Sequence, residues 1–143
     1  MPGAPSWALD TNVVVSGLLS PIGPSGRLID MLLAGQLRLT LDDRVEAEYR
    51  EVLSRPKFRI PDVRMEAFLA VLQFQDSVSA APWSQRRPVD SDDTKFLEVA
   101  WYATDRILVT GNQKHFPKAC RGGVKILTPR LAWEKFSKDR ARA

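Results

Sequence analysis

Two kinds of hydrophobic pattern alternate along the chain. Short, continuous apolar runs predict buried strands at residues 7–9, 37–41, 107–110 and 124–127. Between them, apolar residues recur every three or four positions, as Leu28, Ile29 and Leu32 do, and this spacing predicts amphipathic helices. The helices are expected at residues 25–34, from Asp42 or Asp43 to before Pro56, at 62–75, from Asp92 or Asp93 to about 103, and after Thr128-Pro129, with a short helix or turn at 13–19. Such alternation favours an α/β fold with a central, mostly parallel sheet flanked by helices.

Local signals support several of these boundaries. Ser25 is expected to cap one helix, and Asp42 or Asp43 to cap the next. Residues 81–88, which include Trp83, show neither pattern and are expected to form a loop.

Four polar residues lie where the predicted elements begin, end or border the core. Asp10 and Asn112 each follow a predicted strand, and Asp93 opens a helix. Glu48 borders the buried face of the helix that ends before Pro56. Sites in parallel sheets gather at the carboxyl ends of the strands, so these side chains are expected around one crevice. Oxygen ligands favour hard cations such as Mg²⁺ and Mn²⁺, and this set indicates phosphodiester chemistry.

Each of these residues also has a purely structural interpretation. The sequence Asp10-Thr11-Asn12 is common in turns and caps. Asp92-Asp93 is typical of a helix N-terminus, where acids are favourable. Glu48 can form an exposed ion pair, and Asn112 can occupy a turn. Only their joint placement favours a functional site.

The charge of the chain adds a second indication. Its net charge is +4 at pH 7, which favours phosphate-rich partners. Arg86 and Arg87 directly precede the acidic segment 90–93, where they can hold a phosphate near a metal. Trp83, in the same loop, is the tryptophan best suited to stack on an RNA base.

The other tryptophans and the C-terminus have structural interpretations. Trp101 and Trp133 lie in helical patterns and are expected in the core. The basic residues of the C-terminal tail, 137–143, are expected to be solvated and frayed.

Cysteine usage and hydropathy bear on location. The single cysteine, Cys120, cannot form an intramolecular disulfide, which is typical of a reducing compartment. Residues 1–6 lack the segments of a secretory signal, and no run approaches the roughly 20 apolar residues of a membrane helix. A cytoplasmic protein with no membrane partner is expected.

Four motifs, in order and at full-domain spacing, resemble those of a PIN domain. They are Leu9-Asp10-Thr11-Asn12, Glu48-Tyr49 in a helix ending Val52-Leu53-Ser54-Arg55-Pro56-Lys57-Phe58, Asp92-Asp93-Thr94-Lys95-Phe96-Leu97-Glu98, and Val109-Thr110-Gly111-Asn112 before His115-Phe116-Pro117. Within that superfamily the chain is most similar to VapC-like toxin components of toxin–antitoxin systems. The resemblance spans about residues 7–136, so residues 1–143 are expected to form a single PIN-like domain with a basic tail.

The resemblance implies a three-layer sandwich that uses Mg²⁺ or Mn²⁺ to cleave RNA. Asp10, Glu48 and Asp93 match the three family acids, with Asp92 as the reserve for the third. Asn112 stands where many PIN domains have Asp, so one negative charge is missing and a second metal is weakened. An RNA substrate, an antitoxin protein and a homodimer or higher oligomer are the expected partners and assembly.

The expected chemistry is metal-assisted hydrolysis. Asp10 and Asp93 would hold the cation, while Glu48 would orient or deprotonate the attacking water. His115, the only histidine, is expected to pack or cap a turn.

Three further residues are expected to support Asp10. Asn12 would order the Asp10 turn through side-chain hydrogen bonds. Thr11 and Thr110 would supply either hydroxyl groups behind the site or turn structure.

Two other functions compete with the nuclease. A PIN-like RNA- or protein-binding module with weakened catalysis is favoured by Asn112. A phosphotransferase with Asp10 as covalent nucleophile is disfavoured, because such enzymes want a second Asp where Asn12 stands.

Overall fold

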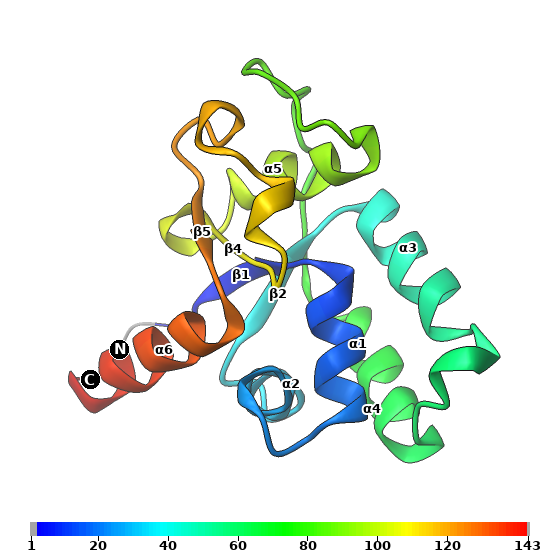
Figure 1. Ribbon diagram of the computed structural model, residues 1–143. Coiled ribbons are helices and arrows are strands. Elements are labelled where there is room, and N and C mark those ends of the chain that lie inside the picture. Colours follow the sequence, from blue (N-terminus) through cyan, green and yellow to red (C-terminus); the bar gives the residue numbers. More distant parts are fainter. Residues whose placement is uncertain (1–2, 143) are drawn as a thin grey trace.

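A five-stranded, fully parallel sheet forms the centre of the structure, a computed structural model that describes residues 3–142 (Figure 1). Its order is β3-β2-β1-β4-β5. The strands are β1 (Ser6–Leu9), β2 (Arg38–Leu41), β3 (Asp76–Ser77), β4 (Ile107–Val109) and β5 (Lys125–Leu127). The expected α/β sandwich is confirmed, and the sheet is parallel throughout.

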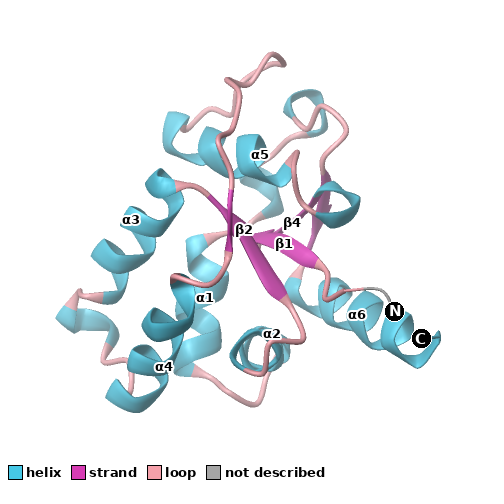
Figure 2. Cartoon of the chain, turned by 180° about the vertical axis from the view of Figure 1, so that it is seen from behind, coloured by secondary structure: helices cyan, strands magenta, loops and turns pink. Residues whose placement is uncertain are grey.

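Helices cover both sides of this sheet. They are α1 (Thr11–Leu19), α2 (Pro24–Leu33), α3 (Asp43–Leu53), α4 (Asp62–Leu72), α5 (Thr94–Ala100) and α6 (Pro129–Arg142). In both ribbon views α5 lies on one side of the sheet, while α1, α2 and α6 lie on the other (Figures 1 and 2). The three layers expected from the sequence are therefore present.

The chain changes direction across the sheet between β1 and β4. From β1 it proceeds through β2 to β3 on one side, then returns to add β4 and β5 on the other. Leu9 of β1 lies in register with Val109 of β4, so the two strands end side by side. Such a switch point opens a crevice at the carboxyl ends of the strands.

Burial explains why these short strands hold together. The side chains of Trp7, Leu9 and the whole of β4 are almost inaccessible to solvent. Tyr49 of α3 is fully buried and donates its hydroxyl hydrogen to the carbonyl oxygen of Leu9. This bond attaches α3 to the end of β1, where the crevice begins.

Several element boundaries differ from those predicted. The helix expected at 62–75 ends at Leu72, and the following strand, β3, was not predicted. The helix expected from Asp92 or Asp93 begins with a 3-10 turn, Ser91–Asp93, and its α-helical part ends at Ala100. In both cases the last residues expected to be helical form a turn instead, at Gln73-Phe74 and at Trp101-Tyr102.

The structure also shows which of the expected residues cap the helices. Asp42, rather than Asp43, caps α3, because its Oδ1 accepts a hydrogen bond from the Val45 amide at 3.0 Å. The predicted cap Ser25 is wrong: Gly23 is the N-cap of α2, and Pro24 occupies the first helical position. Ser25 lies inside the helix and is buried.

The C-terminal segment is helical, so the expectation of a frayed tail is wrong for the described part. Helix α6 continues through Arg142. Trp133 in this helix is half-buried and stacks on Phe136, with ring centroids 5.7 Å apart, as a core-facing residue should. Within residues 3–142, no helix combines the length and the apolar character needed to cross a membrane.

Candidate functional site

Asp10 lies at the carboxyl end of β1, at the switch point of the sheet. Its backbone N–H donates to the Val109 carbonyl oxygen at 2.9 Å, which fixes it beside β4. Its carboxylate is 7% exposed, and Oδ2 accepts a hydrogen bond of 2.8 Å from the Thr110 hydroxyl. Burial raises the pKa of Asp10, while the bond from Thr110 acts in the opposite direction.

Asp93 faces the same crevice from the start of α5. Its side chain is 14% exposed. Burial, and after it the negative charge of Asp10, raise its pKa to about 6. The two carboxylates therefore lie close enough to repel each other.

One oxygen of Asp93 lacks a hydrogen-bond partner. Oδ2 is buried, and the nearest cationic atom is Nδ1 of His115 at 3.4 Å. That separation suits an ion pair, but the two groups are not aligned as a hydrogen bond, so the oxygen remains unsatisfied. A buried carboxylate oxygen in this state is a vacant ligand position for a cation.

Glu48 of α3 borders the site but is held by two other groups. Its Oε2 accepts a hydrogen bond from the Thr11 hydroxyl, and Lys95 Nζ lies 2.7 Å from Oε1. Its charge still contributes to raising the pKa of Asp10, after the larger effect of burial. Glu48 is thus near Asp10 while both of its oxygens are engaged.

Asn112 closes the crevice beyond β4. Its backbone N–H donates to the Thr110 hydroxyl oxygen at 3.1 Å. Its side-chain Nδ2 lies 3.0 Å from Nε2 of His115, within hydrogen-bond distance. His115 is exposed, so it does not pack in the core. It contacts Asn112 at the start of the turn Gln113–His115, as the capping alternative predicted, and it also lies against Asp93.

The residues expected to support Asp10 divide into two groups. Thr110 bonds Asp10 directly, and Thr11 bonds Glu48, so both hydroxyl groups take part in the site. The prediction for Asn12 is wrong, because its exposed side chain makes no hydrogen bond to any residue that the structure describes. Thr110, which reaches Asp10 from the neighbouring strand, supplies the ordering contact instead.

The structure also separates Asp93 from the reserve candidate Asp92. Asp92 is exposed, and its carbonyl oxygen accepts a hydrogen bond of 2.6 Å from Lys95 Nζ. Only Asp93 is partly buried and electrostatically coupled to Asp10.

The fit to a divalent cation rests on two carboxylates rather than three. Among residues 3–142, no three or more histidine, cysteine or acidic side chains gather closely enough to hold a metal ion. The expected set of three is not assembled, because Glu48 is turned toward Thr11 and Lys95. Asp10 and Asp93 nevertheless suit one Mg²⁺ or Mn²⁺, since Mg²⁺ is commonly held by one or two carboxylates, waters and substrate phosphate.

A cavity of about 220 Å³ is lined by Asp92 and Thr94, the residues on either side of Asp93 in the sequence. Its charged lining includes Arg44, Arg87, Lys95, Asp92 and Glu98. This arrangement places the predicted phosphate-binding Arg87 next to α5. Arg86 lines a different cavity, on the side of Pro117 and Cys120.

Trp83, expected in an exposed loop where it could stack on RNA, is largely buried. Its side chain is only 8% exposed, and its indole N–H donates to the Cys120 carbonyl oxygen at 3.0 Å. The loop that carries it folds back on the protein, so the ring packs as part of the core. Trp101, expected in the core, is instead 39% exposed.

We did not predict from the sequence the basic side chains that form ion pairs with the acidic residues around the site. Lys95 pairs with Glu48, and Arg44 joins Asp42 at 2.6 Å to Glu98 at 2.8 Å. The position of Lys95, two residues after Asp93, was a usable signal. Nothing in the sequence indicated the contact between Arg44 and Glu98, because 54 positions separate them.

Comparisons with known proteins agree with this geometry. Over 141 residues the chain is 27% identical to the uncharacterized protein MJ1680 of Methanocaldococcus jannaschii, a match that covers 91% of this chain and 90% of that protein. No solved structure matches it. Residues 7–114 match the PIN domain family, and this range includes all the residues at the carboxyl ends of β1 and β4 described above. The chain therefore belongs to the PIN-domain family.

Proposed function

We propose that this protein is a Mg²⁺- or Mn²⁺-dependent endoribonuclease that hydrolyses RNA phosphodiester bonds. PIN domains are generally nucleases. The observation that carries the proposal is the pair Asp10 and Asp93 at the switch point of the sheet. Both carboxylates are mostly buried, and the charge of Asp10 raises the pKa of Asp93, so a bound cation would relieve their repulsion. Sites of α/β proteins occur at this position.

Asp10 and Asp93 are the residues that would hold the cation. The unsatisfied Oδ2 of Asp93 and the mutual repulsion of the two carboxylates both support this assignment. When bound, the cation supplies Lewis acidity, which lowers the pKa of a water molecule and neutralises charge on the phosphate.

The surrounding residues orient the reacting groups. Thr110 holds Oδ2 of Asp10 and thereby limits the rotation of that carboxylate. Glu48 would orient the attacking water or accept its proton, while Thr11 and Lys95 position Glu48. Asn112 and His115 form the opposite border, where they contact each other and His115 also lies against Asp93.

RNA as the substrate is supported by charge. The chain carries a net charge of +4, and three cationic side chains line the cavity that Asp92 and Thr94 border. Cations at that place can hold the phosphates on either side of the bond to be cleaved, which increases affinity through counterion release.

The cellular role that we propose is that of the toxin in a toxin–antitoxin pair. It rests on the resemblance of the sequence motifs to VapC-like toxins. On this proposal the enzyme acts in the cytoplasm, is restrained by an antitoxin protein and assembles as a homodimer or higher oligomer.

A second candidate is a PIN-like binding module with weakened catalysis. Asn112 supplies no charge, and Glu48 is tied to Lys95 rather than free beside Asp10. Such a module would bind RNA or a protein through the same surface and would cleave nothing.

The test compares wild type with Asp10→Asn and Asp93→Asn on a panel of RNAs, with Mg²⁺, with Mn²⁺ or with chelator. We expect cleavage by wild type only when a divalent ion is present, and a loss of at least about 100-fold in each variant. Asp62→Asn, an exposed aspartate of α4 outside the site, is the matched control and should cleave as wild type does. Equal cleavage by all proteins, or none by any, would refute the nuclease assignment.

A further inference from the structure

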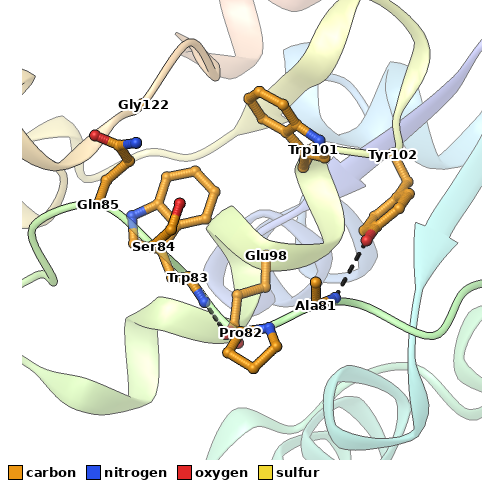
Figure 3. Close-up of a pocket in the computed structure, with 9 residues that line it drawn as sticks. All are labelled: Ala81, Pro82, Trp83, Ser84, Gln85, Glu98, Trp101, Tyr102 and Gly122. Atoms are coloured by element: carbon orange, nitrogen blue, oxygen red, sulfur yellow. Dashed lines mark hydrogen bonds between the residues drawn. The ribbon is translucent and has the colours of Figure 1, made fainter.

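A second cavity lies at the carboxyl end of α5 (Figure 3). It has a volume of about 200 Å³ and is formed where the segment 81–85 passes the end of α5. Trp101 and Tyr102, which directly follow α5, line it on one side, and Trp83 lines it on the other. We refer to this cavity as the aromatic pocket.

The aromatic pocket is rigid and its aromatic surface is accessible. Trp101 is 39% and Tyr102 46% exposed, although both are large aromatic residues. Trp101 is held against Trp83, with ring centroids 6.4 Å apart, and the Arg106 guanidinium lies 3.4 Å from its ring centroid. Because these contacts already hold the exposed Trp101 side chain in position, it loses little conformational entropy when it binds a flat ligand.

Polar groups around these rings retain hydrogen-bonding capacity. The Tyr102 hydroxyl oxygen accepts from the Ala81 N–H at 3.2 Å and can still donate its own hydrogen. One carboxylate oxygen of Glu98 accepts a hydrogen bond of 2.8 Å from Arg44, and the other accepts one of 2.8 Å from the backbone N–H of Trp83. Each oxygen can accept one more bond. The aromatic pocket therefore offers both aromatic surface and directional polar groups.

Glu98 lies between the aromatic pocket and the cavity of about 220 Å³ described above, which we call the cationic cavity. It lines both, together with Arg44, Arg87 and Lys95 in the second. Glu98 follows Asp93 by five residues, a rise of about 7 Å along a helix. The two cavities therefore meet at Glu98, and the second is also lined by Asp92 and Thr94, which flank Asp93 in the sequence.

We propose that these two cavities together bind one nucleotide of a single-stranded RNA, with its phosphate beside Arg87 and its base in the aromatic pocket. This inference rests on the proposed function, because it assigns a subsite next to the bond that the acidic pair would cleave. A volume of about 200 Å³ is below the roughly 300–1,000 Å³ of sites for drug-sized ligands and suits a single ring system. Base stacking on aromatic rings and phosphate contacts to basic side chains are the usual means of holding single strands.

The experiment measures binding without cleavage. Short, fluorescein-labelled oligo(U) and oligo(A) RNAs are titrated with metal-free protein in chelator, and anisotropy is followed at several salt concentrations. We expect Trp101→Ala to weaken binding by about 5- to 150-fold, the equivalent of 1–3 kcal/mol of stacking, without changing the salt dependence. Arg87→Ala should reduce the slope of log K against log salt by about 0.7.

Two control variants match these changes outside both cavities. Phe74→Ala removes an aromatic ring that is 66% exposed, and Arg130→Ala removes a guanidinium that is 82% exposed on α6. Both should bind RNA as wild type does. Circular dichroism confirms the fold of each variant, and Arg87→Ala tests the proposal even if Trp101→Ala does not fold, because Arg87 is exposed.

The outcomes separate this inference from the proposed function. Wild-type affinity and salt slope in both Trp101→Ala and Arg87→Ala would overturn the nucleotide subsite, even if the protein cleaves RNA. Weakened binding in these variants of a protein that cleaves nothing would uphold the subsite and reject the nuclease. An effect of Phe74→Ala as large as that of Trp101→Ala would also overturn it, because binding would then follow general hydrophobic surface.

Discussion

Lys95 Nζ lies 2.7 Å from Oε1 of Glu48 and joins α5 to α3 beside the acidic pair. The two side chains are only 12% and 28% exposed, so solvent screens their attraction less than it screens a surface pair. The Thr11 hydroxyl holds the second oxygen of Glu48. Glu48 is therefore fixed in one orientation, as a residue that must position a water molecule should be.

The substitution Glu48→Gln tests this role. It keeps the size and one acceptor oxygen but removes the charge, so cleavage of RNA should fall by about 10²–10⁴-fold, the usual contribution of a general base. Stability should change by about 1 kcal/mol or less, because partly exposed ion pairs contribute little. Single-turnover cleavage and thermal unfolding measure the two effects.

Glu46→Gln is the matched control on the same helix. Glu46 pairs with Arg50 on the outer side of α3, at 3.1 Å, and has no contact with Asp10 or Asp93. It should cleave as wild type does. If Glu48→Gln also retained wild-type cleavage, Glu48 would have no part in catalysis.

Asp93 should make stability depend on pH. Its pKa is about 6 in the folded protein, chiefly because of burial, against 3.8 for an ordinary aspartate. Between these values the folded state binds more protons than the unfolded state, so the free energy of unfolding falls as pH rises from about 4 to about 6. The full loss is on the order of 1–3 kcal/mol after allowance for solvent screening.

Asp93→Asn should remove this dependence. In chelator, the variant should be more stable than wild type at pH 8 and should lose that advantage below about pH 4. Urea unfolding across this range measures the difference, with Asp92→Asn as the control that should follow wild type. If the free energies of unfolding of wild type and Asp93→Asn changed in parallel with pH, burial of the Asp93 carboxylate would not destabilise the folded protein.

Much of the site could be predicted because it depends on neighbouring strand ends. In a parallel sheet, the residues that follow two paired strands meet at one edge, and the register of Leu9 with Val109 brings Thr110 to Asp10. The sequence alone therefore sufficed to place Asp10 and Asn112 at one crevice. Asp93 was identified over Asp92 because only one of the two could begin the apolar stripe of α5.

The remaining features depend on contacts that no local pattern records. Strand β3 consists of two polar residues, and the Arg38 Nε–H donates to its Asp76 at 3.0 Å from 38 positions away. Trp83 is buried because its indole meets Cys120, 37 positions further along. The loop shows no hydrophobic periodicity, so the sequence predicted that Trp83 would be exposed, whereas in the structure it is buried.

Asn112→Asp should strengthen binding of a divalent cation. The new carboxylate would stand at the border of the crevice, beside His115 and one residue beyond Gly111, and would add a negative charge to the site. We expect Mn²⁺ to bind about fivefold more tightly, which corresponds to about 1 kcal/mol of added attraction. Calorimetry with Mn²⁺ measures the affinity, and an unchanged value would remove Asn112 from the metal-binding region.

Trp83→Ala should destabilise the protein, because this residue belongs to the core as well as to the wall of the aromatic pocket. The ring is buried and its N–H bonds the Cys120 carbonyl, so truncation should lower the free energy of unfolding by about 3–5 kcal/mol. Trp83→Phe keeps one aromatic ring but loses that bond and part of the buried volume, which should cost about 1–3 kcal/mol. Phe74→Ala, an exposed aromatic truncation, should cost less than about 0.5 kcal/mol. Urea unfolding ranks the three variants. An unchanged midpoint for Trp83→Ala, together with weaker RNA binding, would return Trp83 to the surface as a base-stacking residue.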